Sequence, residues 1–303
     1  MTFEQQQTTY TVFKRKQEYF KIHKDLAKNL DKMKNQQNND WDFKIIVSGN
    51  GKTRTGKSTL AAQMANYMDP NFLDGWKDRI CFSGREVMKS AKKLPKGSWI
   101  IYDEARGGLN NKKQMFGFVQ ELMDFLNECG NLNQGIIFVL PDFFDLPKSV
   151  CVNQTIFSLN CYTVGAFKRG YFNFYSGNDK RLLYFKGNKQ ANHGAHPPTF
   201  GGTFPKGFPV DKEIYEQYKK STLKAIRQEQ KKEGSEIKKL RDRIALLLFK
   251  LKRDYDIDYK DSGKMVGVHR NTVTKWLNRE SVKIESQMHN FGSKFINSDK
   301  EEV

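Results

Sequence analysis

The sequence is poor in cysteine, and the cysteines it has are not paired. The four residues Cys81, Cys129, Cys151 and Cys161 are widely spaced and form no C-x-x-C motif. This pattern excludes a zinc site built on paired cysteines, and it excludes a disulfide framework. It favours free thiols in a reducing, cytoplasmic setting.

Long hydrophobic runs and a signal-peptide pattern are also missing. The longest apolar run, residues 135–144, is interrupted by Pro141 and Asp142 and is about half the length of a membrane span. The N-terminal residues 1–7 are polar and resemble no secretion signal. We therefore expect a cytoplasmic protein with no membrane segment.

Acidic residues are too few to balance the basic ones. The chain has 52 Lys and Arg residues against 34 Asp and Glu, a formal net charge of +18. Such an excess favours a polyanionic partner, either nucleic acid or an anionic membrane surface, although a soluble basic protein without such a partner has the same composition. Hydrophobic residues make up 38% of the chain and aromatic residues 13%, which is enough for a folded core.

The central part of the chain alternates short apolar strands with helices, which predicts an α/β fold with a parallel sheet covered on both faces. We expect strands at Phe43–Ser48, Arg79–Phe82, Ser98–Tyr102 and Gly135–Leu140. We expect helices at Ser58–Tyr67, at Ser83–Lys92 with Ser83 as N-cap, and at Gln114–Asn127.

The flanking segments have other patterns. Residues 1–40 form a basic N-terminal segment, in which the apolar spacing of Tyr10–Lys34 predicts an amphipathic helix. After Gln154 the pattern predicts an antiparallel extension of the sheet, followed by an irregular loop and a charged helix. These elements are expected at Ile156–Ala166, Tyr171–Tyr175 and Leu182–Lys186 (strands), His193–Pro209 (loop) and Asp211–Lys232 (helix).

A phosphate-binding loop motif lies between the first expected strand and the helix that follows it. The segment matches G-x-x-x-x-G-K-[ST] at every fixed position, so we expect it to cradle the phosphates of ATP through backbone N–H groups. Lys57 should reach the β- and γ-phosphates, Ser58 should bind Mg²⁺, and Thr59 should add a hydroxyl contact. The segment consists of Gly51, Lys52, Thr53, Arg54, Thr55, Gly56, Lys57 and Ser58, with Thr59 next.

Two adjacent carboxylates end the strand at Ser98–Tyr102, the arrangement known as Walker B. Asp103 should hold Mg²⁺ through a water, and Glu104 should polarise the water that attacks the γ-phosphate. Solvated acids at a strand end are common on their own, but a phosphate-binding loop upstream favours the catalytic interpretation. The expected catalytic residues are Lys57, Asp103 and Glu104.

The order of these motifs resembles the HerA/FtsK-like branch of P-loop ATPases, and zonular-occludens-toxin-like phage and plasmid proteins are similar. The resemblance covers residues 43–220, and only the two Walker elements are specific. It implies a RecA-like core, ring-shaped homo-oligomers that are often hexamers, and ATP-driven movement or packaging of DNA. Further segments that look like parts of the pattern are Arg79–Glu86, Trp99–Gly108, Ile136–Phe144 and Ile214–Lys220.

Two features of this family have no clear counterpart here. The family often carries a polar sensor, frequently Gln, after the strand that follows Walker B, and Asp142 or Asn133–Gln134 are the candidates in this chain. A trans-acting arginine finger must lie outside residues 107–168, which contain no arginine. Arg106 and Arg169 are the candidates.

The C-terminal part predicts a small all-α module at residues 235–284, followed by a patternless tail at residues 285–303. Leu240–Lys252 has a helical apolar stripe, and Asp261–Leu277 resembles a helix-turn-helix with its turn at Gly267. DNA contacts are then expected from the start and outer face of the second helix; a three-helix bundle used for protein contacts is the alternative. The expected contacts are His269, Arg270, Asn271, Thr272, Thr274 and Lys275.

These observations predict a Mg²⁺-dependent ATPase domain at residues 41–232 that acts on DNA as a homo-oligomeric ring. We expect a DNA motor or DNA-transfer ATPase of a plasmid, phage or virus. An alternative is an ATP-switched, site-specific DNA-binding regulator or replication-initiation factor that does not translocate. A phage-assembly ATPase that handles protein at a membrane is a third possibility, which the lack of a membrane segment disfavours.

Overall fold

The computed structural model describes residues 9–103, 125 and 132–276. The chain divides into two compact units, Met1–Lys224 and Ala225–Val303, and each is described separately below. Among the described residues, no helix has the length and apolar character needed to cross a membrane.

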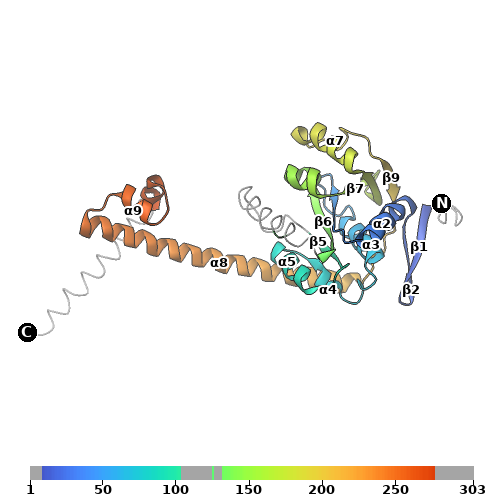
Figure 1. The fold of residues 1–303 in the computed structure, drawn as a ribbon, viewed down its shortest axis with the longest axis horizontal. Helices are drawn as coiled ribbons and strands as arrows, with labels where there is room; N and C mark the ends of the chain where they lie inside the picture. The colour runs from blue at the N-terminus through green and yellow to red at the C-terminus, as the bar shows by residue number, and fades with distance from the viewer. Residues whose placement is uncertain (1–8, 104–124, 126–131, 277–303) are drawn as a thin grey trace, which may run out of the picture. The chain divides into compact units, whose positions relative to one another are not determined.

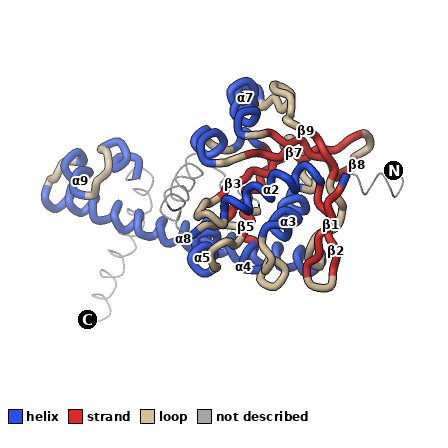
Figure 2. Tube along the Cα trace, turned by 45° about the vertical axis from the view of Figure 1, so that its right-hand side comes forward, coloured by secondary structure: helices blue, strands red, loops and turns tan. Residues whose placement is uncertain are grey.

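The first unit is built on a seven-stranded, mostly parallel sheet with helices, so the expected α/β class with an antiparallel extension is confirmed. The strand order is β4-β5-β6-β3-β7-β8-β9; the pairs from β4 to β7 are parallel, and the pairs β7–β8 and β8–β9 are antiparallel. Figures 1 and 2 show this sheet from two sides. Its strands are β3 (Phe43–Gly49), β4 (Ile80–Cys81), β5 (Trp99–Tyr102), β6 (Gly135–Asp142), β7 (Phe157–Val164), β8 (Lys168–Tyr175) and β9 (Phe200–Thr203).

Helices pack on the parallel strands because consecutive strand residues face opposite sides of the sheet. On one side, α5 (Gly84–Lys93) and α7 (Gly177–Gly187) share a buried apolar cluster with Ile100, Ile136 and Phe138. The helix α3 (Lys57–Met68) contacts β3, β5 and β6 and buries Leu60, Ala61 and Met64. The expected N-cap Ser83 is present at α5 and is part of a capping box: Ser83 Oγ accepts from Glu86 N, and the Glu86 carboxylate accepts from Ser83 N.

The predicted helix at Tyr10–Lys34 is wrong over its first half. Residues 10–23 form an antiparallel hairpin of β1 (Tyr10–Arg15) and β2 (Glu18–His23), and only α2 (Lys24–Gln37) is helical. The hairpin packs on the end of α3, with the ring of Phe13 edge-on to Tyr67 at 5.0 Å. Arg15 donates to the carbonyls of Asn66 and Tyr67, which would otherwise lack partners at the end of the helix.

Two predictions after β8 are also wrong. The segment Leu182–Lys186, expected to be a strand, belongs to α7, whose N-cap Ser176 accepts from Asp179 N. Within α7 the fully buried Lys180 donates to Thr155 Oγ1, and burial lowers the pKa of Lys180 to about 8. The expected irregular loop at His193–Pro209 contains the edge strand β9.

The sequence predicted that the charged helix ends at Lys232, and this prediction is wrong. Instead, α8 runs without interruption from Lys212 to Tyr255, and Gly234 lies inside it. The boundary between the two units falls within α8, at Lys224, and not at a break in the helix. A β-carbon at Gly234 would meet no atom within 4 Å, so nothing in the structure requires a glycine there.

The second unit packs α9 (Tyr259–Met265) and a helical segment at residues 270–276 against the last turns of α8. The buried side chains of Leu248 and Val273 form its centre, with Ile244, Leu251, Tyr259, Val268 and Trp276 around them. Gly267 lies between the two short helices at φ +69°, where the absence of a β-carbon avoids strain. Leu277 and the expected tail at residues 285–303 lie outside the described residues.

Candidate nucleotide and metal site

The expected phosphate-binding loop lies between β3 and α3, as the motif predicted. Its backbone takes left-handed conformations at Gly51 (φ +70°), Arg54 (φ +60°) and Gly56 (φ +96°). Gly56 precedes α3, which has no side-chain cap, so the first N–H groups of the helix face the loop without a capping side chain. A curled backbone at an uncapped helix N-terminus is a favourable site for an anion.

Lys57 lies across this loop. Its Nζ donates to the carbonyl of Lys52 at 2.8 Å and lies 3.3 Å from Thr55 Oγ1. A β-carbon at Gly49 would come within 3.2 Å of the Lys57 Nζ, so a larger residue at the end of β3 would crowd the ammonium group. The ammonium group is thus held over the concave side of the loop, where phosphates would bind.

Asp103 follows β5 and joins the loop through Ser58. The Ser58 hydroxyl donates to Asp103 Oδ1 at 3.1 Å, and the Asp103 residue is 2% exposed. The two groups come together because parallel strands β3 and β5 end at the same edge of the sheet, with β6 between them. A hydroxyl beside one buried carboxylate fits Mg²⁺, which takes few protein ligands and keeps waters and phosphate oxygens for the rest. These two residues would hold the ion.

Two residues from the start of α8 also contact Asp103. The hydroxyl of Tyr215 donates to Asp103 Oδ2, and the Nζ of Lys219 lies 3.0 Å from the same oxygen. Burial and the charge of Asp103 raise the pKa of Tyr215, so its phenol remains a neutral donor. Neither residue is among the site residues that the sequence predicts. Lys212, Tyr215 and Lys219 are spaced to share one face of a helix, but a solvent-exposed charged helix has the same spacing, so this signal is not specific.

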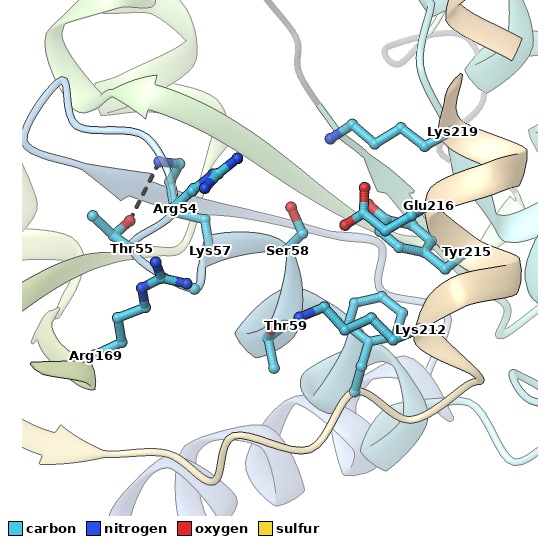
Figure 3. A pocket seen from close by; sticks show the side chains of 12 residues that line it. Arg54, Thr55, Lys57, Ser58, Thr59, Arg169, Lys212, Tyr215, Glu216 and Lys219 are labelled. Atoms are coloured by element: carbon cyan, nitrogen blue, oxygen red, sulfur yellow. Dashed lines mark hydrogen bonds between the residues drawn. The ribbon is translucent and has the colours of Figure 1, made fainter. Parts of the chain in front are cut away.

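Residues 54–59 and side chains of α8 line one pocket of about 520 Å³ (Figure 3). Side chains of α8 face the loop from one side, while Arg169 of β8 approaches it from the other. The pocket is strongly cationic: against the single carboxylate of Glu216, its lining includes Arg54, Lys57, Arg169, Lys212 and Lys219. This charge suits a polyphosphate.

The other candidates predicted from the sequence differ in where they lie relative to the loop. Arg169 lines the pocket of its own chain, so its position does not favour the expected trans-acting role. Glu104 and Arg106 lie outside the described residues. Asn133 and Gln134 precede β6, next to the start of β3, and are therefore at the far edge of the sheet from the loop. Asp142, the other sensor candidate, pairs with Gly49 and so lies beside the loop.

The expected DNA-contacting residues lie together in the second unit. His269, Arg270, Asn271 and Lys275 are exposed, and Thr272 and Thr274 are half-buried. The backbone carbonyl of Arg270 accepts from the hydroxyl of Thr274 at 3.1 Å, which turns this hydroxyl towards its own helix. The four exposed residues are therefore the better placed of the six for contact with a partner.

Comparison with known proteins gives no relative: no protein-family model matches the sequence, and no curated protein matches it significantly. Any function must be inferred from the residues and their geometry.

Proposed function

We propose that this protein is a Mg²⁺-dependent ATPase that couples hydrolysis to the binding or translocation of DNA. The observation that carries the proposal is the meeting of Lys57, Ser58 and Asp103 at one edge of the parallel sheet, where Lys57 and Ser58 line a cationic pocket. A triphosphate needs cations and backbone N–H groups along its length, and its metal needs oxygen ligands at one end. The described residues offer both.

Each residue has a role in this proposal. Lys57 neutralises the β- and γ-phosphates, and Ser58 with Asp103 holds the Mg²⁺ ion, which would neutralise charge on the phosphates. Glu104, the next residue after Asp103, is the proposed general base that polarises the attacking water, a role that rests on the sequence alone. Electrostatic stabilisation by positioned cations is the principal contribution of such a site.

A RecA-like core that assembles into homo-oligomeric rings is part of the same proposal. Support comes from the parallel strands of the first unit, which bring the phosphate loop and Asp103 to one sheet edge. The proposed work is DNA movement or transfer for a plasmid, phage or virus. The net charge of +18 supports a nucleic-acid partner.

The second unit supports a second candidate function. A helix-turn-helix at residues 259–276 would present Arg270 and Asn271, which can make paired hydrogen bonds to guanine and adenine in the major groove. Their exposure favours an ATP-switched regulator or initiation factor that reads one DNA site. Such a protein would not need to translocate.

Steady-state hydrolysis of ATP with and without DNA tests both candidates. We expect Glu104→Gln to bind ATP but to lose at least about 100-fold in turnover, because general bases contribute that much or more. Lys57→Met should fail to bind ATP at all. Unchanged turnover in Glu104→Gln would remove the proposed base.

The form of DNA that stimulates turnover separates the two candidates. A motor should be stimulated by long DNA of any sequence, whereas a regulator should respond to one short duplex. Lys220→Met is the control for Lys57→Met and should hydrolyse ATP like the wild type. This exposed lysine lies next to Lys219 but does not line the pocket. Failure of the wild type to hydrolyse ATP under any of these conditions would refute the proposal.

A further inference from the structure

A second pocket of about 430 Å³ adjoins the proposed phosphate site. It shares Gly56, Thr59, Arg169 and Lys212 with the first pocket, but it touches neither Lys57 nor Ser58. Its outer wall is the tip of the β7–β8 hairpin, which carries Phe167.

The position of this pocket fixes which part of a nucleotide it would take. Ser58 and Asp103 mark the metal and therefore the γ-phosphate end of a triphosphate. Thr59, one residue further along α3, lines both pockets and so connects the loop to the second one. A triphosphate held in this direction has its nucleoside in the second pocket.

The pocket offers two aromatic rings. Phe204 is 6% exposed and packs on the loop: a β-carbon at Gly56 would come within 2.8 Å of its ring. Phe167 is 84% exposed and has a φ of +63°, an uncommon conformation for a bulky residue. The turn at the tip of the hairpin thus presents the Phe167 ring to solvent at the edge of the pocket, where a ligand could stack on it.

The charged groups of the pocket are cations, which suit the phosphate and ribose of a nucleotide. The side chains of Lys168, Arg169, Lys206 and Lys212 reach it, and the described residues that line it include no acidic or amide side chain. Adenine and cytosine are read by amides and carboxylates, which the described lining lacks; arginine and lysine can pair with guanine, but here we place them along the ribose and the α-phosphate. Aromatic stacking tolerates all bases, because every base has a π-face.

We propose that this second pocket holds the nucleoside by stacking on Phe167, with cations along the ribose and α-phosphate, and that it discriminates little between bases. This inference rests on the proposed nucleotide site and extends it: the substrate class is nucleoside triphosphates in general, with ATP as one of them.

Competitive displacement of a fluorescent ATP analogue from the full-length protein, in Mg²⁺, tests the inference. The competitors are the β,γ-imido analogues of ATP, GTP and CTP, together with inorganic tripolyphosphate, which has no nucleoside. In the wild type, we expect the three nucleotides to bind within about fivefold of one another. In Phe167→Ala, the affinities of all three nucleotides should fall by roughly five- to tenfold, which is the lower part of the range for the loss of one stacked ring. The affinity of tripolyphosphate should not change.

Two further variants separate stacking from folding. Phe167→Trp should retain nucleotide affinity, because it keeps an aromatic face. Phe185→Ala is the matched control, since Phe185 is an exposed phenylalanine on α7 that does not line the pocket. It should bind every competitor like the wild type.

The possible failures are distinguishable. A preference of more than about 50-fold for one base would overturn the inference, and so would nucleotide affinities that Phe167→Ala leaves unchanged. Equal weakening of tripolyphosphate would show a structural role for Phe167 and would also overturn it. If the wild type bound neither tripolyphosphate nor any nucleotide at millimolar concentration, the proposed function itself would fail, and this inference with it.

Discussion

At the scale of single residues, the state of Asp103 is the most informative feature. Its carboxylate is buried and accepts from three side chains of its own chain: Ser58, Tyr215 and Lys219. Ser58 donates to the Oδ1 atom of Asp103, and Tyr215 and Lys219 donate to its Oδ2 atom. The ammonium group of Lys219 therefore lies where a water bound to Mg²⁺ would donate, and a positive charge there opposes an incoming cation.

Removal of this ammonium group should make the site easier to load with metal. In Lys219→Met we expect the Mg²⁺ concentration for half-maximal binding of a fluorescent ATP analogue to fall by about tenfold, because a hydrogen bond to a charged group is worth roughly 1.5 kcal/mol. Titration of Mg²⁺ at saturating nucleotide measures this value. Lys220→Met should behave like the wild type, and a higher Mg²⁺ requirement in Lys219→Met would contradict competition for Asp103.

The residues of the site divide by whether a local pattern reveals them. Lys57, Ser58 and Asp103 are predictable because each belongs to a motif in which backbone geometry and chemistry are tied together within a few residues. Tyr215 and Lys219 cannot be predicted in this way, because only the return of the chain to the sheet edge brings them to Asp103. A lysine and a tyrosine on a charged helix have the same local pattern whether they face solvent or a carboxylate.

At the scale of secondary-structure elements, the parallel strands, the antiparallel strand β8 and α5 could be predicted from the sequence, whereas the hairpin β1–β2, α7 and β9 could not. Buried strands such as β3 and β6 are mostly apolar, and the capping box of α5 is a local signal. The hairpin β1–β2 depends on packing against α3, and α7 depends on a cap and a buried lysine. Aromatic and charged residues occur in both helices and strands, so the tertiary contacts determine which of the two forms.

Two glycines in the C-terminal part allow a matched test of the helices. Gly234 lies inside α8 with open space around it, whereas a β-carbon at Gly263 would come within 2.7 Å of the Val268 carbonyl oxygen. We expect Gly234→Ala to stabilise α8 by up to about 1 kcal/mol, the difference in helix propensity. Gly263→Ala should destabilise the second unit by about 1–3 kcal/mol, because the backbone must move.

Thermal melts followed by circular dichroism at 222 nm distinguish the two variants. The transition of Gly234→Ala should shift upwards and that of Gly263→Ala downwards. A lower melting temperature for Gly234→Ala would mean that the chain needs a break in α8, as the sequence first suggested.

At the scale of the whole molecule, the two proposed activities belong to different units. Every residue that lines the two pockets precedes Lys224, while the proposed DNA-reading residues, His269 to Lys275, follow it. The helix α8 carries residues of both, because it begins at the pocket and continues to Tyr255. The expected domain boundary near Lys232 lies next to Gly234, but a single glycine costs only about 1 kcal/mol in a helix and does not end α8.

This division predicts that nucleotide and DNA binding can be separated by truncation. A fragment of residues 1–224 keeps Lys219 and all the pocket residues, so we expect its affinity for a fluorescent ATP analogue to stay within about threefold of the full chain, less than 1 kcal/mol. Its affinity for a short duplex, measured by fluorescence anisotropy, should fall steeply. In the full chain, Arg270→Ala with Lys275→Ala should also weaken duplex binding and reduce its dependence on salt, because fewer counterions are released. Nucleotide binding by this double variant should be unchanged. A fragment that binds the duplex as tightly as the full chain would place the DNA contacts in the first unit, whose cationic pockets would then be the surface to examine.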